Sequence, residues 1–382
     1  MVKKKILVMT DHMPWGHRSI ARAIYGFLKT KEKEENFEVY YAEVKSEMGI
    51  SNDIYQFSYR YLPLSSRIGR WMSYLPQIRK VIEELSFTNL SAPKKVVQKI
   101  KPDLVISTYW FHSHSLAGWK DRGDVNFKLW TVVADPWTVL PVSYNSKIDM
   151  HLVYDQMGVD VGMKECGIPK NKILETGWWT RPEMFGKFDR KEARKKLGFS
   201  DDRQVVFVGG GSLGTNSLTK LLPALMLIKG KVGFIFNTGT DKLAYNLVEQ
   251  YTRLYKKLNK QGNVIIKNLG WIENMGEVLA GVDIVFGKAG PNFLFDVVAS
   301  QKPFVAITHI GGQEDGNIDL IKKKGLGWVK EKGTEAADFL LAYLEDPKRY
   351  QDKFKKNIET EARKNEKSMG IILGEIKREM RI

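Results

Sequence analysis

Short apolar runs alternate with helix-like stretches along the chain, and this alternation constrains the fold more than any other feature of the sequence. Most runs are apolar throughout, as in parallel strands that are buried on both faces. Repeated strand–helix–strand units therefore predict a doubly wound α/β fold. The predicted strands are Lys5–Thr10, Glu38–Ala42, Leu104–Thr108, Lys128–Val133, Met150–Val153, Gln204–Val208, Val232–Asn237, Val264–Lys267, Val282–Phe286 and Phe304–Ile307. The predicted helices are Ser19–Leu28, Lys94–Ile100, Ser217–Ile228, Lys242–Leu258, Asn292–Ser300 and Ile318–Lys324.

The units fall into two sets, and a length of 382 residues also favours two domains over one. The stretch Thr176–Lys187, which is rich in Gly, Pro and aromatic residues, separates the sets. We therefore expect one Rossmann-like domain over residues 1–178 and a second over residues 179–345. Residues 346–382 are highly charged and helical in pattern, and we expect this tail to pack across both domains.

Ligands of doubly wound domains bind beyond the carboxyl ends of the strands, so the loops at those ends are the candidate sites. The loop Gly209–Gly214, G-G-G-S-L-G, follows a predicted strand and can be read as G-x-G-x-x-G. An NAD site also needs an acidic residue at the end of the next strand, which here ends in Asn237. We therefore expect a pyrophosphate at these loop amides rather than NAD, the alternative being a glycine-rich turn without a ligand.

A second loop of this type, G-K-A-G-P, spans Gly287–Pro291. Pro291 fits the first position of a helix, where its missing N–H costs nothing. Gly290 is expected to turn the chain with a positive φ, and Lys288 could neutralise a phosphate. The alternative is a purely structural turn between a strand and a helix.

The segment His309–Asn317, H-I-G-G-Q-E-D-G-N, follows the next predicted strand. Gln313, Glu314 and Asn317 surround a predicted helix start, where amide and carboxylate groups can hydrogen-bond vicinal hydroxyls. The alternative is helix capping by Asp315 or Asn317.

The first strand leads into D-H-M-P-W-G-H-R, which places Asp11, His12 and His17 in one loop. A carboxylate and an imidazole at a strand end are candidates for general-base catalysis. His112 and His114 could suggest a metal site, but two histidines without a Cys or carboxylate cluster support it poorly, and we expect none. The chain has neither a G-x-S-x-G nucleophile elbow nor a Walker A loop.

The net charge of +16 suggests nucleic acid, an anionic membrane surface or an anionic substrate as a partner, with solvated surface lysines as the plain alternative. Residues 51–100 carry eight Lys or Arg against three Asp or Glu, mixed with Tyr and Trp, a combination that suits lipid headgroups or nucleic acid. The start of the chain is expected to form a strand rather than a signal peptide, and no apolar run reaches the roughly 20 residues of a membrane span. Cys166 is the one cysteine, which fits a reducing, intracellular setting.

These loops together resemble a family, the glycosyltransferases of the MurG and monogalactosyldiacylglycerol synthase superfamily, which have the two-domain GT-B fold. The carboxyl half has F-G-K-A-G-P-x-x-x-x-D, then P-F-V and G-G-Q-E-x-G-N, in the family's order and spacing. The amino half has D-x-x-x-x-G-H-R, then T-V-V-A-D-P-W-T and K-I-L-E-T-G-W. The resemblance runs from about residue 4 to residue 330.

The resemblance implies transfer of a sugar from a nucleotide diphosphate donor, usually UDP-linked, with inversion and without a metal or other cofactor. It implies that Asp11 or His17 acts as the base on the acceptor hydroxyl, with Asp135 in a second acidic loop, and we expect Asp11 to be the base before His17. It also implies a set of donor-binding residues: Gly210, Gly211, Ser212, Gly270, Trp271, Lys288, Ala289, Gly290, Pro291, Asn292, Asp296, Gln313, Glu314 and Asn317.

Two departures lie in the donor helix: Asn292-Phe293 stand where the family has Gly-Thr, and Asp296 replaces a glutamate that holds the ribose hydroxyls. On the acceptor side, a basic and aromatic patch in the amino domain is expected to dock on an anionic membrane that carries a lipid acceptor, at its cytoplasmic face. The patch residues are Arg60, Arg67, Arg70, Trp71 and Tyr74.

Three alternatives stay open at this point. The same architecture serves sugar-nucleotide 2-epimerases, which act on the donor alone. A glycosyltransferase can also act on a soluble acceptor. A non-catalytic nucleotide-binding or nucleic-acid-binding protein is the third, although the chain has no nucleic-acid motif and no such partner is expected.

Overall fold

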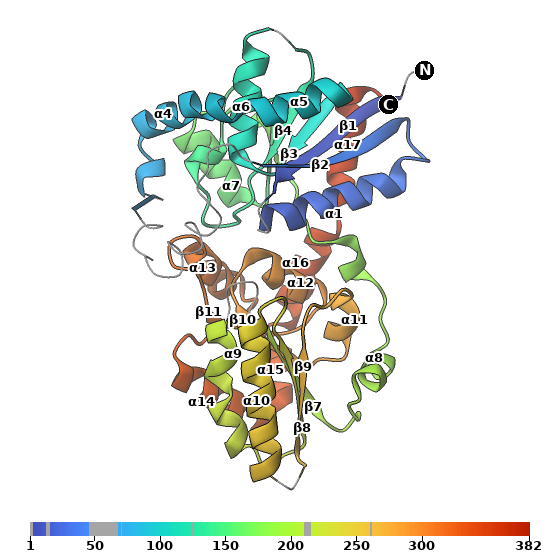
Figure 1. Ribbon diagram of the computed structural model, residues 1–382, viewed down its shortest axis with the longest axis vertical. Helices are drawn as coiled ribbons and strands as arrows, with labels where there is room; N and C mark the ends of the chain where they lie inside the picture. Colours follow the sequence, from blue (N-terminus) through green and yellow to red (C-terminus); the bar gives the residue numbers. More distant parts are fainter. Residues whose placement is uncertain are drawn as a thin grey trace. The chain divides into compact units, whose positions relative to one another are not determined.

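A computed structural model describes residues 3–12, 16–45, 68–69, 71–123, 125–209, 215–259 and 262–382. The chain divides into two compact units (Figure 1). The first comprises Met1–Pro182, Gly311–Gly316 and Lys364–Ile382, and the second comprises Glu183–Ile310 and Asn317–Arg363. The first unit thus runs slightly beyond the predicted boundary at residue 178, and the predicted tail is divided between the two units.

The first unit is built on a parallel sheet with six strands among its described residues, in the order β2-β1-β3-β4-β5-β6. The chain runs from β1 outward to β2 and then returns to place β3 on the other side of β1. The carboxyl ends of β1 and β3 therefore flank the switch point, where doubly wound sheets bind ligands. The strands are β1 (Lys4–Asp11), β2 (Phe37–Val44), β3 (Leu104–Ser107), β4 (Lys128–Val132), β5 (Met150–Val153) and β6 (Ile173–Glu175).

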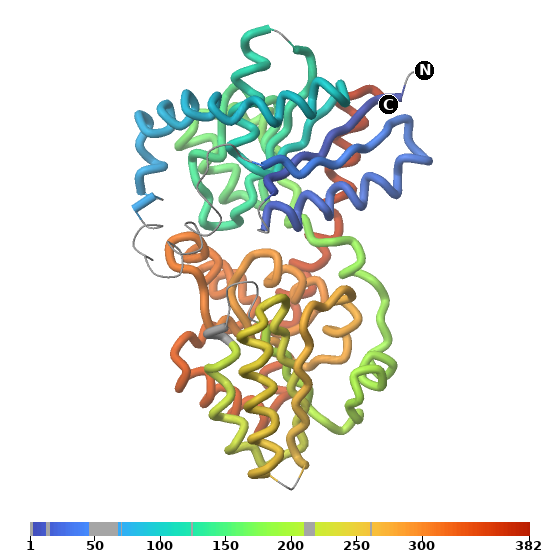
Figure 2. The backbone as a smooth tube through the Cα atoms, viewed as in Figure 1, coloured from blue at the N-terminus to red at the C-terminus, as the bar shows by residue number. Residues whose placement is uncertain are grey.

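Helices cover both faces of this sheet, with α5 and α6 across one face and α1 on the other (Figure 1). The last helix, α17, packs against α1, so both ends of the chain lie on the first unit (Figure 2). Ion pairs support this packing, since Lys377 contacts Glu35 and Lys128 contacts Glu379. The helices are α1 (Gly16–Lys31), α4 (Pro76–Ser86), α5 (Ser91–Ile100), α6 (Trp110–Asp121), α7 (Gln156–Asp160) and α17 (Ser368–Met380). Shorter turns are η1 (Phe87–Asn89), η2 (Pro141–Ser143), η3 (Val161–Glu165) and η4 (Lys170–Lys172).

The second unit has a parallel sheet, again with six strands in its described part, in the order β12-β11-β10-β7-β8-β9. The chain runs from β7 through β8 to β9 and then returns to place β10 on the other side of β7. This second switch point lies between Gly209 and Gly287, which are paired across β7 and β10. The strands are β7 (Gln204–Gly209), β8 (Val232–Asn237), β9 (Val264–Leu269), β10 (Ile284–Lys288), β11 (Phe304–Thr308) and β12 (Gly327–Val329).

Seven helices and most of α13 and α16 surround this sheet among the described residues. Pro223 ends the first of the predicted helices early, because proline removes a backbone donor and clashes with the preceding turn. The predicted helix Ser217–Ile228 is therefore α9 followed by the 3-10 turn η7. The elements are η5 (Pro182–Phe185), α8 (Arg190–Leu197), α9 (Thr215–Leu221), η7 (Pro223–Leu227), α10 (Lys242–Leu258), α11 (Met275–Ala280), α12 (Pro291–Ala299), α13 (Asp315–Lys324), α14 (Gly333–Glu345), α15 (Pro347–Lys353) and α16 (Lys355–Glu366).

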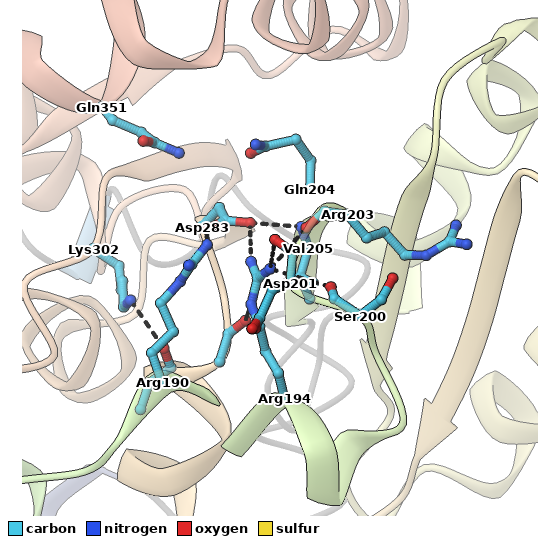
Figure 3. A network of polar contacts seen from close by, with 12 residues as sticks. Arg190, Arg194, Ser200, Asp201, Arg203, Gln204, Val205, Asp283, Lys302 and Gln351 are labelled. Carbon is cyan, nitrogen blue, oxygen red and sulfur yellow. Dashed lines mark hydrogen bonds and ion pairs between the residues drawn. The ribbon is translucent and has the colours of Figure 1, made fainter. Parts of the chain in front are cut away.

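A buried ion pair fixes the adjacency of β7 and β10 at the end of the sheet opposite the switch point (Figure 3). Asp283 Oδ2 accepts hydrogen bonds from Arg194 Nη2 at 2.5 Å and from the Val205 amide at 2.7 Å, and Oδ1 accepts from Arg190 Nη2 at 2.8 Å. Both charges are almost fully covered, so each depends on the other for compensation. The nearby Lys302 amine donates to the Ala280 carbonyl, and burial lowers the pKa of Lys302 to about 8.

Candidate active site

Asp11 is the last residue of β1, and its buried carboxylate lies at the switch point of the first sheet. Its Oδ2 is 3.5 Å from His112 Nε2 on α6. Asn89 Nδ2 is 2.9 Å from His112 Nδ1, and because an amide nitrogen can only donate, Nδ1 must accept. The proton of His112 is therefore on Nε2, which donates to the Val44 carbonyl at 3.1 Å and faces Asp11. His112 is thus a neighbour of the Asp11 carboxylate that Asn89 and the Val44 carbonyl hold in place.

His17 lies in the first turn of α1, and its half-buried ring stands edge-on to Tyr109 with 5.6 Å between ring centroids. The Thr108 hydroxyl is 3.0 Å from the His17 carbonyl and 2.9 Å from Thr10 Oγ1, which ties the start of α1 to β1. Nδ1 of His17 is buried and has no hydrogen-bond partner among the described residues. Burial lowers the pKa of His17, opposed by a backbone hydrogen bond with Thr108 and by the Asp11 charge. A neutral imidazole whose buried Nδ1 has no partner among the described residues therefore lies beside a carboxylate.

Glu43 organises a cationic cluster next to this pair that sequence reasoning missed. Its Oε1 accepts from Arg18 Nε at 2.9 Å, from Arg22 Nη2 at 3.0 Å and from the Tyr41 hydroxyl at 2.8 Å. Burial alone would raise the pKa of Glu43, but these hydrogen bonds and charges outweigh it and the pKa is lowered. The arginine of G-H-R, directly after His17, was the signal that could have revealed this partner.

The other predicted residues of the first unit have simpler surroundings. His114 is buried between the Val142 carbonyl and Asn145, and burial lowers the pKa of His114 to about 4, so the ring is a neutral part of the core. Asp135 lies in the partly buried loop between β4 and η2. In the described part of the chain, no group of three or more His, Cys, Asp or Glu residues could hold a metal ion. Transfer without a metal stays a prediction.

The predicted membrane patch is described only in part, because Arg60, Arg67 and Arg70 lie outside the described residues. Trp71 is strongly exposed, and the Tyr74 hydroxyl lies 3.5 Å from the Val139 carbonyl. Further exposed apolar side chains accompany them before and along α4. Together the exposed set is Ile68, Trp71, Met72, Tyr74, Val81 and Leu85, which we call the α4 surface.

At the switch point of the second sheet the site is built from backbone and one ring. A Cβ at Gly209 would lie 2.6 Å from Phe293 Cζ, and one at Gly287 would lie 2.6 Å from Phe293 Cε1. The Phe293 ring thus covers both strand ends. It can occupy this position only because both residues are glycine. This explains the aromatic residue in a place where the family has a threonine. Gly210, Gly211 and Ser212 lie outside the described residues.

The turn after β10 is held by the neighbouring strand and by α13. The Ala289 amide donates to the Thr308 carbonyl at 2.8 Å, and Asn317 Nδ2 donates to the Ala289 carbonyl at 2.8 Å. Asn317 is 1% exposed, and its Oδ1 has no partner among the described residues. The structure therefore brings together two predicted donor motifs, the turn at Lys288–Pro291 and the helix that carries Asn317.

Gly290 corrects one prediction, since its φ is −70° and its ψ is 138° rather than a positive φ. The reason is Pro291, because a residue before proline is restricted to extended conformations. Gly290 is the N-cap of α12 and has no side chain that could cap this helix end.

The remaining donor residues are distributed as follows. Asp296 is on α12, and Gly270 with the strongly exposed Trp271 follows β9. Gln313 and the buried Glu314 belong to the segment Gly311–Gly316, which groups with the first unit. In this segment Asp315 Oδ1 accepts from the Gly312 amide at 2.9 Å, and the Gly316 amide donates to Thr138 Oγ1 at 2.9 Å.

Comparison with known families accounts for both halves. Residues 6–178 match the family described as monogalactosyldiacylglycerol (MGDG) synthase, and residues 205–369 match the glycosyltransferase family 28 C-terminal domain.

Two curated relatives and one solved structure illustrate the likeness. UDP-N-acetylglucosamine–N-acetylmuramyl-(pentapeptide) pyrophosphoryl-undecaprenol N-acetylglucosamine transferase of Halalkalibacterium halodurans is 25% identical over 66% of this chain and 67% of its own. Processive diacylglycerol beta-glucosyltransferase of Bacillus mycoides is 23% identical over 91% of this chain and 87% of its own. Acinetobacter baumannii MurG has a similar fold, with a TM-score of 0.59 at 14% identity over 97% and 99% of the two chains.

The order of strands, the two switch points and the two family matches agree with one another. The chain is a glycosyltransferase with the GT-B fold and belongs to the superfamily of MurG and the monogalactosyldiacylglycerol synthases.

Proposed function

We propose that the chain transfers a sugar from a UDP-sugar to a membrane lipid of the diacylglycerol or isoprenoid type, with inversion at the anomeric carbon. The observation that carries the proposal is the placement of Asp11 and His17 at the switch point of the half that matches the galactolipid synthases. The relatives named above act on pyrophosphoryl-undecaprenol and diacylglycerol, which supports a lipid acceptor.

On the acceptor side, His17 removes the proton from the attacking hydroxyl. Its lowered pKa keeps the imidazole neutral near pH 7, and Nδ1 has no partner among the described residues. Asp11 stabilises the imidazolium that forms, and His112 keeps the carboxylate in place. Such a base contributes on the order of 10²–10⁴ to the rate. A single displacement with one base and no enzyme nucleophile inverts the configuration.

On the donor side, the leaving group is a nucleotide diphosphate whose negative charge grows as the bond to the sugar breaks. The amides at the start of α12 and the ammonium of Lys288 stabilise this charge, in place of a metal. Asn317 Oδ1 accepts a hydrogen bond from a sugar hydroxyl, and Asp296 holds the ribose. Buried polar groups of this kind give selectivity because a donor without the matching hydroxyl leaves them unpaired.

We propose that the enzyme is a peripheral protein of the cytoplasmic face of the membrane, which it contacts through the α4 surface. Trp71 and Tyr74 are suited to the headgroup layer, where an aromatic ring meets both apolar and polar surroundings. Among the described helices, none is long and apolar enough to cross a bilayer.

The test is a transfer assay with UDP-glucose, UDP-galactose and UDP-N-acetylglucosamine, each with diacylglycerol or an isoprenyl phosphate in vesicles and with EDTA present. We expect one UDP-sugar to give a glycolipid, and proton NMR to show the inverted anomer. Transfer to soluble acceptors alone would refute the lipid assignment. Loss of activity in EDTA that added metal restores would refute the metal-free mechanism. Formation of a UDP-sugar epimer in the absence of an acceptor would refute sugar transfer as the reaction.

A further inference from the structure

Helix α10 of the second unit carries an exposed row of leucines. Positions 243, 247, 254 and 258 fall on one side of a helix with 3.6 residues per turn. Leu243 is 81% exposed, Leu254 53% and Leu258 63%, and Leu247 is also exposed. The adjacent side of α10 already packs on the sheet through Ala244, Val248 and Tyr255, so the leucine row is not needed for this packing.

The turn η7 also carries exposed apolar side chains, and the segment that leads into it lies beside α10. The Tyr251 hydroxyl donates to the Leu222 carbonyl directly before η7, and α9, which leads into η7, lies beside α10 (Figure 1). Met226 and Leu227 of η7 are both exposed. We call the six exposed residues the α10 surface: Met226, Leu227, Leu243, Leu247, Leu254 and Leu258. Contiguous exposed apolar areas of this kind mark interaction sites.

Cations border the leucine row on the side away from the sheet. Lys242, Arg253 and Lys257 are exposed and follow the polar face of α10. Glu249, the acidic residue of this helix, is turned to the sheet, where it accepts a hydrogen bond from Asn268 Nδ2 at 3.0 Å. An apolar row with cations along one edge is the pattern of helices that lie in the surface of an anionic membrane.

We infer that the α10 surface is a second membrane-docking surface, which binds anionic phospholipid bilayers separately from the α4 surface. Charge selects this occupant over a second copy of the chain. Two copies that met through this face with α10 antiparallel would bring Lys242, Arg253 and Lys257 against the same cations. In either orientation the face offers them no acidic residue of α10, because Glu249 is bonded to Asn268. Phosphate headgroups supply the opposite charge, and the acyl region accepts the leucines.

The choice of a lipid partner rests on the proposed transfer reaction. The experiment measures vesicle binding without donor or acceptor, so its outcome does not depend on whether transfer occurs. The background is the full chain carrying Trp71→Ser and Tyr74→Ser, which weakens the α4 surface. In this background, Leu254→Ser with Leu258→Ser is expected to lower binding to vesicles of 30% phosphatidylglycerol about tenfold. Arg253→Gln with Lys257→Gln is expected to lower it by a similar factor, and only at low salt.

The matched control is Ile371→Ser, which removes an exposed apolar side chain from α17 and is expected to leave binding unchanged. Thermal unfolding of each variant confirms that the fold is intact. Unchanged vesicle binding in both double variants would overturn the inference. So would a concentration-dependent dimer in sedimentation velocity that the leucine variant abolishes, because that result would make a second copy the occupant.

Discussion

The two switch points are built from different parts of the polypeptide. In the first unit the strand ends carry functional side chains, with Asp11, His17 and His112 brought together by β1, α1 and α6. In the second unit the strand ends are Gly209 and Gly287, covered by the Phe293 ring, with the start of α12 beside them. The difference teaches that proton transfer needs a tuned side chain, whereas a diphosphate can be held largely by backbone amides. Substitutions should therefore act on chemistry in the first unit and on donor binding or stability in the second.

The largest effect is expected from His17→Ala, which removes the proposed base. We expect kcat to fall by about 10²–10⁴, and UDP binding measured by calorimetry to stay unchanged. In Asp11→Asn we expect kcat to fall less, because the imidazole of His17 remains. Full activity in both variants would contradict the proposed difference between the two units, because these side chains of the first unit would then contribute nothing to the chemistry.

Acid is expected to destabilise the first unit selectively. Burial lowers the pKa of both His114 and His151 to about 4, whereas an unfolded histidine has a pKa of about 6.5. Between these values only the unfolded state binds the proton, so stability falls as the pH decreases from about 6.5 to about 4. Each histidine accounts for up to about 3 kcal/mol of this loss.

Hydrogen exchange of the two units at pH 7 and pH 5 checks the acid prediction. Amides of β4 and β5 should lose protection at the lower pH before amides of β7 and β10 do. Replacement of His151 by Gln should flatten the pH dependence, and an unaltered profile in that variant would contradict the assignment.

Overpacking at the second switch point is expected to cost about 1–3 kcal/mol of stability. The three described atoms nearest to a Cβ at Gly209 belong to the Phe293 and Phe207 rings, so Gly209→Ala should be rescued by Phe293→Leu. A Cβ at Gly287 lies 2.7 Å from the Gly209 carbonyl oxygen, a backbone atom that cannot move aside, so Gly287→Ala should not be rescued. Thermal melts of the two single and two double variants test this difference. Equal rescue of both alanine variants by Phe293→Leu would contradict it.

The smallest effect is expected from Asn317→Ala. Among the described residues of the second site, Asn317 is the one whose side chain has a buried oxygen without a partner. Loss of its bond to the Ala289 carbonyl and of a bond to the sugar should raise the donor KM about tenfold with little change in kcat. Steady-state kinetics with the matched control Asn357→Ala, farther along the same unit, provide the check. A fall in kcat alone would indicate that Asn317 acts in the chemical step and not in donor binding.

The sequence predicted the strands well because buried parallel strands are apolar throughout. Met150–Val153 and Val232–Asn237 match β5 and β8 residue for residue, whereas the three-residue strands β6 and β12 are too short for such a signal. Helix α6 was missed because Phe111 to Trp119 are all buried, so the segment has no polar face to reveal its period.

The candidate site was predictable in its residue types but not in its partners. D-x-x-x-x-G-H-R predicts a base near Asp11, but it cannot predict that His112, far along the chain, fixes that carboxylate. Likewise the link from Asn317 to the Ala289 carbonyl joins two motifs that are separate in sequence. Such contacts depend on which strands become neighbours, and the local pattern of residues does not contain that information.

The Asp283 contacts have a practical meaning for anyone who wishes to isolate the donor half. The family 28 match begins at residue 205, and a fragment cut there would lose both guanidinium groups while keeping their carboxylate in the interior. An excised half that is to remain folded must therefore start before Arg190, since α8 belongs to that half as firmly as any of its strands.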